Sequence, residues 1–414
     1  METKSNSNNT KISEHSISLE DQEDNTSVGI PNNINASDID NETRSKLKGD
    51  AIGDTLYSES FVLKTLIQFS DLKWSQQVEE DLCFLWDMTI EKDVCKYLFN
   101  MSYPSLACSA IIKYKESRFR EIVIGILANI MCADCEKVIT DDEINTILLE
   151  LDNDDHLILI QVMRFLSAVA HNFNKLPYIN EEIMQKIKFI LNNSMNVELL
   201  INTLDACAKL TDLKLSEDLI DVELFMATLT SYRTIMEEED GIISFDTKEK
   251  QQCCKCMLEI IKNICSYIES FENPELLVEI QKNANDYVKE VVKMLDFYSH
   301  EENLFPLSDD LIFYIDVIRY TLTTLNVGYT STLLLNVSKI FCHILNVEDE
   351  VPELFDSVLE IECYLLSREL PDIILKDFMF LPRDKVKVVL NSVKQNVHKY
   401  DYGINIQKLL SKYK

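Results

Sequence analysis

Cysteine is the residue of this chain with the clearest capacity for site chemistry, and the sequence has 12 of them. Cys132 and Cys135 form a single C-x-x-C pair, whereas structural zinc needs four ligands, usually from two such pairs. The next cluster, Cys253, Cys254 and Cys256, lies in a segment predicted to be helical, far along the chain. We therefore expect reduced, mostly buried thiols and no metal or redox site.

Other patterns typical of catalysis or ligand binding fail on inspection. Residues 238–243 resemble the middle of a calcium loop, but setting Gly241 at the sixth position puts Met236 first and Thr247 last, where a ligand and a bidentate Glu are needed. The six histidines stand apart from any G-x-S-x-G motif, and seven scattered glycines cannot form a P-loop or a dinucleotide fingerprint. We expect no catalytic, cofactor-binding or metal-ligating residue and a protein that is not an enzyme.

The elements that position the remaining polar side chains are predicted to be helices throughout. Hydrophobic residues make up 46% of the 414 residues, with only 7 Gly and 8 Pro. Apolar residues recur at helical spacing from residue 49 onward. Phe61, Leu63, Leu66 and Ile67 mark a first helix, residues 82–98 a second, Pro104 the start of a third, and residues 118–132 a long apolar one.

Segments similar to the long apolar helix recur further along the chain. Segments around Ala128, Ala168, Ala206 and Ile260 look alike, the first three about 40 residues apart. A period near 40 with two or three helices per unit is typical of armadillo and HEAT arrays. We predict an all-α, armadillo/HEAT-like solenoid over residues 49–414, in which 49–75 form an N-terminal cap. Residues 1–48 lack periodicity and are expected to be a disordered acidic and polar tail.

Two asparagines on these helices are candidate partner contacts. Importin-type armadillo arrays bind extended peptides through an asparagine ladder beside tryptophans, and Asn129 and Asn263 fall at comparable places. The position four residues before Asn129 is Gly125 rather than Trp, so any ladder is partial. The alternative is that both asparagines are polar groups near helix ends.

Trp86 and Gly125 are predicted to have structural roles. Trp86 shares its helix with Leu82, Leu85 and Met88, which places it on or beside the buried seam. Gly125 lies mid-helix, where glycine costs about 1 kcal/mol relative to alanine. That cost favours a close approach, and we expect Gly125 to face a helix of the preceding unit, the one that holds Trp86.

Charge restricts the partners. The chain has 40 basic and 70 acidic residues, a net charge of −30, which disfavours nucleic-acid binding over most of the surface. From Arg383 to Lys414, however, there are 8 basic and 2 acidic residues. This basic end either docks on the acidic body or serves as an import or phosphate-binding tail. We see no signal peptide and no membrane span, and we expect an intracellular protein that is not secreted.

Several stretches together resemble the serum amyloid A-like protein family, an animal family of armadillo-type proteins. They are residues 49–58 (GDAIGDTLYS), residues 85–88 (LWDM) with Asp93 and Val94, residues 120–129 (REIVIGILAN) and, more weakly, residues 196–200 (NVELL). The resemblance is best over 76–135, specific over 49–135 and faint from 136 to 215. It implies a nuclear protein, which could also be cytoplasmic, linked to promotion of cell proliferation. It supplies no catalytic residue.

These observations lead us to expect a non-enzymatic interaction scaffold or adaptor. It would contact other proteins along a concave face, and its excess of acidic residues would favour partners that have basic segments. The alternative is a transport receptor or chaperone-like binder of basic cargo, held by acidic connectors. No cofactor is implied, and the oligomeric state is not indicated.

Overall fold

The computed structural model describes residues 49–70, 74–133, 139–172, 178–213, 215, 219–237, 248–347, 351–400 and 402–413. Three features singled out above lie outside these residues: the tail 1–48, Cys135 of the C-x-x-C pair, and the calcium-loop-like stretch 238–243. Within the described ranges the chain forms α-helices and short 3₁₀ turns and has no strand. The predicted all-α solenoid is confirmed.

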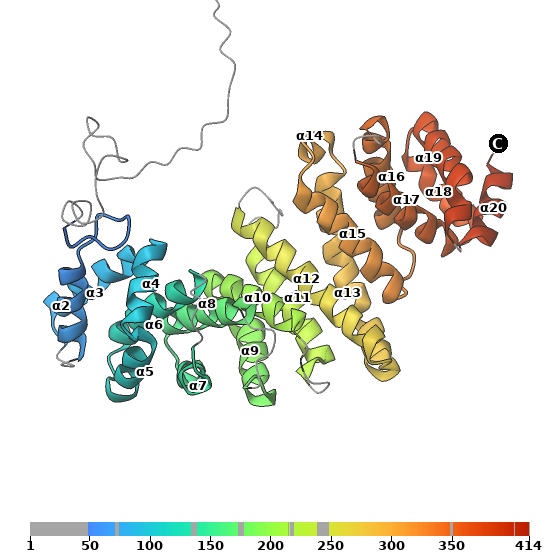
Figure 1. The fold of residues 1–414 in the computed structure, drawn as a ribbon. Coiled ribbons are helices and arrows are strands. Elements are labelled where there is room, and N and C mark those ends of the chain that lie inside the picture. The colour runs from blue at the N-terminus through green and yellow to red at the C-terminus, as the bar shows by residue number, and fades with distance from the viewer. Residues whose placement is uncertain are drawn as a thin grey trace, which may run out of the picture.

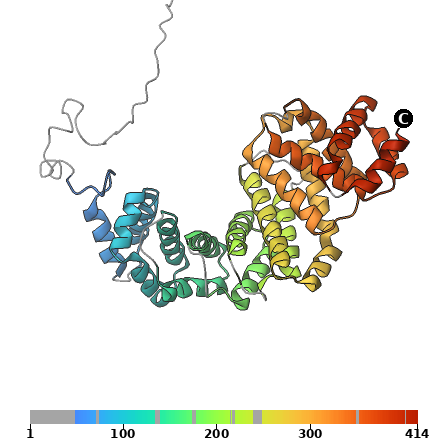
Figure 2. The same ribbon diagram turned by 45° about the vertical axis from the view of Figure 1, so that its right-hand side comes forward.

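The helices stack in two rows along a curved array (Figures 1 and 2). In the first row, each helix contacts the next one in the order α3 (Gln76–Met88), α6 (Ser117–Cys132), α8 (His156–Asn172), α10 (Val197–Asp212), α12 (Lys248–Ser270), α15 (Asp309–Thr324), α17 (Pro352–Ser367) and α20 (Gly403–Lys412).

The second row runs beside the first. It consists of α5 (Tyr103–Lys113), α7 (Asp141–Leu148), α9 (Glu181–Asn193), α11 (Val222–Met236), α13 (Pro274–Tyr298), α16 (Ser331–Ile344) and α19 (Arg383–Asn396), with the 3₁₀ turn η2 (Leu149–Asp152) between α7 and α9. The remaining α-helices are α2 (Glu59–Ser70), α4 (Lys92–Asn100), α14 (Glu301–Leu304) and α18 (Pro371–Asp377). In Figure 1, α5, α7 and α9 lie along the lower edge.

Local sequence explains where these helices begin. Ser308 and Asn196 each accept a hydrogen bond from a backbone N–H of the first turn, and Thr140 forms a capping box with Glu143. Pro104 and Pro274 stand in the first turn of α5 and α13, where a missing N–H costs nothing. The same residue types that interrupt the apolar pattern therefore start the helices.

The repeated apolar segments become consecutive helices of the first row. α6, α8, α10 and α12 pack against one another in that order, as the recurrence of their segments along the chain predicts. Ala128, Ala168 and Ala206 are buried on them, where a small side chain lets neighbouring helices approach. Each of these helices is buried over most of its length, so the core is a continuous seam rather than a single centre.

The expected single helix over residues 82–98 is wrong. α3 ends at Met88 and α4 begins at Lys92. The Thr89 hydroxyl and backbone N–H both donate to the Trp86 carbonyl, which closes the last turn of α3. The turn lets α4 reverse and pack against α5 and α6.

The predicted first helix is confirmed as α2, although only some of its apolar residues face the core. Leu63 and Ile67 do not face the core: Ile67 is 64% exposed, while Val62 and Phe69 are buried, because no described helix precedes α2 to cover its outer face. The pattern also gave no indication of α18 and α20, which are short.

One carboxyl group is sealed between α16 and α17. Glu362 has no exposed surface and accepts hydrogen bonds from the Ser338 hydroxyl at 2.9 and 3.2 Å. Burial raises the pKa of Glu362 to about 8, and the Ser338 hydrogen bond offsets only part of that rise. The side chain is therefore protonated over most of the neutral range.

Candidate functional site

Polar side chains join successive helices of the first row into what we call the polar ladder. Its rungs cross from one helix to the next, and most of the side chains are partly exposed. The rungs are Arg164 to Asn129 (2.7 Å), Ser167 to Asp205, Gln252 to Asp205 (3.3 Å), Asn263 to Thr211 (3.1 Å), Tyr320 to Glu269 (2.8 Å) and Arg319 to Glu360 (3.2 Å).

Asn129 and Asn263 belong to this ladder and lie on different parts of it. The Asn129 amide donates to the Thr89 hydroxyl at 2.8 Å and accepts from Arg164. The Asn263 amide donates to Thr211, and the residue also lines a surface hollow of about 460 Å³. Both amides therefore tie neighbouring helices together, and their contact with a partner stays a prediction.

We predict that Asn129→Ala lowers the free energy of unfolding by about 1–2 kcal/mol, because the change leaves Thr89 and Arg164 without their shared partner. Urea denaturation measures the difference. Asn202→Ala is the matched control, since the Asn202 side chain is partly exposed and its amide bonds only within its own helix; the change should cost less than about 0.5 kcal/mol. An unchanged stability for Asn129→Ala would contradict the structural role.

Gly125 of α6 lies against Trp86 of α3. A Cβ placed on Gly125 would overlap the six-membered ring of the Trp86 indole. Trp86 itself is half-buried and packs on the core, so it lies beside the seam rather than fully inside it. The close approach that the sequence implied is thus between these two residues.

The described cysteines and acids do not form a reactive centre. Burial raises the pKa of Cys207 and Cys265 to about 12, which leaves their thiols protonated and unreactive. Cys253, Cys254 and Cys256 are also buried. Among the residues that the structure describes, no group of three or more Cys, His, Asp or Glu is placed to hold a metal ion. Nor does any helix in these ranges have the length and apolarity to cross a bilayer.

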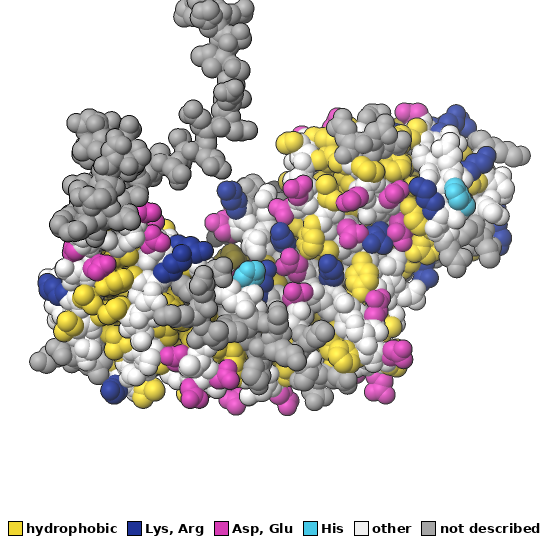
Figure 3. Space-filling model, in the orientation of Figure 1, with side chains coloured by type: hydrophobic (Ala, Val, Ile, Leu, Met, Phe, Trp, Pro, Cys, Tyr) yellow, Lys and Arg dark blue, Asp and Glu magenta, His cyan; other side chains and the backbone are white. Residues whose placement is uncertain are grey.

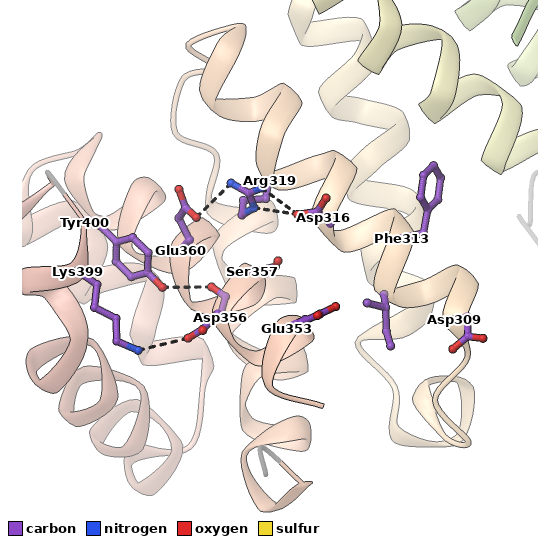
Figure 4. A pocket seen from close by; sticks show the side chains of 11 residues that line it. Asp309, Phe313, Asp316, Arg319, Glu353, Asp356, Ser357, Glu360, Lys399 and Tyr400 are labelled. Carbon is purple, nitrogen blue, oxygen red and sulfur yellow. Dashed lines mark hydrogen bonds and ion pairs between the residues drawn. The ribbon is translucent and has the colours of Figure 1, made fainter. Parts of the chain in front are cut away.

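The feature best suited to hold a partner is an acidic groove between α15 and α17. Its volume is about 760 Å³, and residues from both helices and from the segment after α19 line it (Figure 4). The lining consists of Asp309, Ile312, Phe313, Asp316 and Arg319 on α15, Glu353, Asp356, Ser357 and Glu360 on α17, and Lys399 and Tyr400 beyond them. Five carboxylates thus face two cations.

The cations of the acidic groove are already paired. Arg319 bonds Asp316 at 2.9 Å and Glu360 at 3.2 Å, while Lys399 lies 3.4 Å from Asp356. Burial lowers the pKa of Arg319, but the bond to Asp316 and the charge of Glu360 outweigh it and leave that pKa above its usual value. Arg319 therefore stays positively charged in the wall of the acidic groove.

Two carboxylates of the acidic groove have no cationic partner among the described residues. Asp309 and Glu353 are exposed, lie in the first turns of α15 and α17, and make no ion pair there. Figure 4 shows the Glu353 side chain directed from α17 toward α15. The charge of the acidic groove that is not paired by described residues is therefore negative.

An aromatic ring lies at the edge of the acidic groove, on the side of α15 that faces α12. Phe313 is partly exposed, and the ammonium groups of Lys255 and Lys262 lie 5.7 and 5.9 Å from its ring centre. A ring face attracts cations at this separation. The groove therefore offers both carboxylates and a π-face to a positively charged side chain.

Sequence reasoning missed this groove, although part of its pattern is visible in the chain. Glu353, Asp356 and Glu360 recur at helical spacing on one face of α17, as Asp309 and Asp316 do on α15. Spacing alone does not reveal that these two faces lie opposite each other. That pairing follows only from the order of helices in the first row.

Comparison with known proteins identifies relatives. No protein-family model matches the chain. A zebrafish (Danio rerio) protein named saal1 is 30% identical over 196 residues, covering 42% of each chain. The chain is similar to the SAAL1 proteins. Human SAAL1 is 30% identical over 191 residues, 40% of each chain, and Xenopus tropicalis saal1 is 26% identical over 275 residues, 59% of this chain and 57% of that one.

The SAAL1 relatives support the resemblance to the serum amyloid A-like family that the sequence motifs indicate. The chain spans about half the length of the SAAL1 proteins it matches. Among solved structures, an engineered protein aligns with 90% of this chain and 95% of its own length, with a TM-score of 0.38 at 13% identity.

Proposed function

We propose that this protein is a non-enzymatic adaptor whose acidic groove binds lysine- or arginine-containing segments of other proteins. One observation carries the proposal: Asp309 and Glu353 stand in the groove without cationic partners among the described residues. Two bound cations would pair with these carboxylates. The net charge of −30 would draw such segments toward the protein before contact.

Phe313 supplies the second element of recognition. Its ring already lies near Lys255 and Lys262, and both lysines remain on the surface, so a partner's cation can replace one of them without exposing a buried charge. Exchange of one solvated cation for another costs little, and it favours reversible binding.

The resemblance to the serum amyloid A-like family supports the wider setting that we propose. We infer an armadillo-type protein that acts in the nucleus and also in the cytoplasm, and that promotes cell proliferation through the partners it brings together. The solenoid suits this role because stacked repeats present an extended surface without a catalytic pocket.

The alternative is a transport receptor or chaperone-like binder of basic cargo. Such a protein would hold cargo through many exposed carboxylates, and its affinity for cargo would fall steeply as the salt concentration rises. A groove that also uses Phe313 would retain part of its affinity at moderate salt. The salt dependence of binding therefore separates the two functions.

We predict that the double variant Asp309→Asn, Glu353→Gln binds a basic peptide about tenfold more weakly at low salt, because two charge pairs are lost. The measurement is fluorescence anisotropy of a short labelled peptide of alternating lysine and serine, with the full chain. The matched control is Asp142→Asn, Glu275→Gln, which also neutralises two exposed first-turn acids.

The control variant should bind the peptide as the unmodified protein does. Equal weakening in both variants would show that the peptide responds to net charge alone, and it would rule out the acidic groove as the site.

A further inference from the structure

The basic C-terminal segment is only partly neutralised by the body of the protein. Lys399 pairs with Asp356 at 3.4 Å and Lys412 with Asp372 at 2.7 Å, both on the surface. Lys387 and Lys394 are exposed and make no ion pair with any described residue. Docking on the body therefore leaves cationic side chains available.

These lysines lie on one face of α19, which we call the basic stripe. Arg383, Lys387, Asn391, Lys394 and His398 are exposed and follow one another at intervals of three or four residues. The opposite face of α19 is apolar and buried against α16 and α17: Val386, Val389, Leu390 and Val393. Figure 3 shows Lys and Arg side chains gathered at this end of the array.

An exposed apolar corner leads directly into the basic stripe. Met379 is 82% and Phe380 78% exposed, in the short turn η5 (Phe378–Phe380) that precedes α19. Leu370 and Ile373 on α18 are 65% and 39% exposed. Single exposed apolar residues are ordinary, but four within eleven positions are typical of a contact surface.

We propose that the basic stripe and this apolar corner together dock a short acidic, amphipathic segment of a partner protein. Lys387 and Lys394 would pair with carboxylates of that segment, and Met379 and Phe380 would cover its apolar side chains. A long polyanion such as nucleic acid fits less well, because the rest of the chain is strongly acidic and repels it. This surface is separate from the acidic groove and of opposite charge.

The experiment measures binding of the full chain to a synthetic peptide of glutamate and leucine placed at helical spacing. A scrambled peptide of the same composition, vesicles of phosphatidylserine and phosphatidylcholine, and a single-stranded DNA oligonucleotide serve as competing probes. We expect the amphipathic peptide to bind most tightly. The variant Lys387→Glu, Lys394→Glu should weaken that binding roughly tenfold or more.

Two further variants make the result specific. Lys96→Glu, Lys282→Glu reverses two exposed, unpaired lysines elsewhere in the described chain and should leave the affinity within about twofold. Met379→Ser, Phe380→Ser should remove the preference for the amphipathic peptide over the scrambled one. Unchanged circular dichroism and thermal midpoint show that each variant is folded.

Three results would overturn the proposal. They are equal weakening by the Lys96, Lys282 variant, no preference of the unmodified protein for the amphipathic order, and tighter binding of vesicles or DNA that depends on Lys387 and Lys394. None of these results bears on the acidic groove, because the basic peptide used there would be repelled by the basic stripe.

Discussion

Gly125→Leu should destabilise the protein by about 3 kcal/mol, because the new side chain has no space beside the Trp86 indole. Even the first carbon of a side chain at this position would overlap the ring, so α3 and α6 must separate or the indole must leave its place. The free energy of unfolding, measured by urea denaturation of the full chain, gives the cost.

A double-mutant cycle tests whether Trp86 causes that cost. Trp86→Leu alone should lose about 2–3 kcal/mol, less than a fully buried tryptophan, because the indole is half-buried. In that background Gly125→Leu should cost much less, with a coupling of about 1–3 kcal/mol. Gly328→Leu is the control, since open space surrounds that glycine. Additive effects in the cycle, or a rise in stability for Gly125→Leu, would show that the two residues do not determine the packing.

The second large effect is a pH dependence from Glu362, whose pKa is about 8 when folded against an ordinary 4.5. The folded state holds a proton that the unfolded state has lost, so stability from this group is complete below about pH 4.5. It falls as pH rises through the neutral range, with a slope of up to about 1.4 kcal/mol per pH unit, and levels off above about pH 8.

Glu362→Gln should remove this slope and stabilise the protein by several kcal/mol near pH 8, because the amide stays neutral and can still accept from Ser338. Urea denaturation at several pH values compares the two proteins. Glu353→Gln, a change in an exposed carboxyl of the acidic groove, should leave the slope in place. Parallel pH profiles for the unmodified protein and Glu362→Gln would contradict the assignment.

Much of the fold follows from local patterns in the chain. The apolar residues around Ala128, Ala168 and Ala206 recur at helical spacing, and each segment is a helix of the first row because stacking is the way such a face is buried. The break after Met88 was not predictable in this way. It depends on a hydroxyl of Thr89 that competes for the Trp86 carbonyl, and an apolar pattern does not register that competition.

The acidic groove could not be predicted from the sequence, for a different reason. Its walls come from α15 and α17, and the sequence does not state which faces of two distant helices meet. Asn129 illustrates the same limit: its position near a helix end is evident from spacing, but its bond to Arg164 depends on how far α8 turns relative to α6.

The polar ladder also bears on the mechanics of the array. Each rung spans one joint between neighbouring helices, and most rungs are partly exposed, so each is individually weak and yields at low force. We therefore expect small rotations at successive joints to add up along the described array, so that it bends under load rather than behaving as a rigid rod. The acidic groove and the basic stripe lie close together toward one end of the array, so bending should move them together. α2 and α3 at the other end should be displaced furthest relative to them.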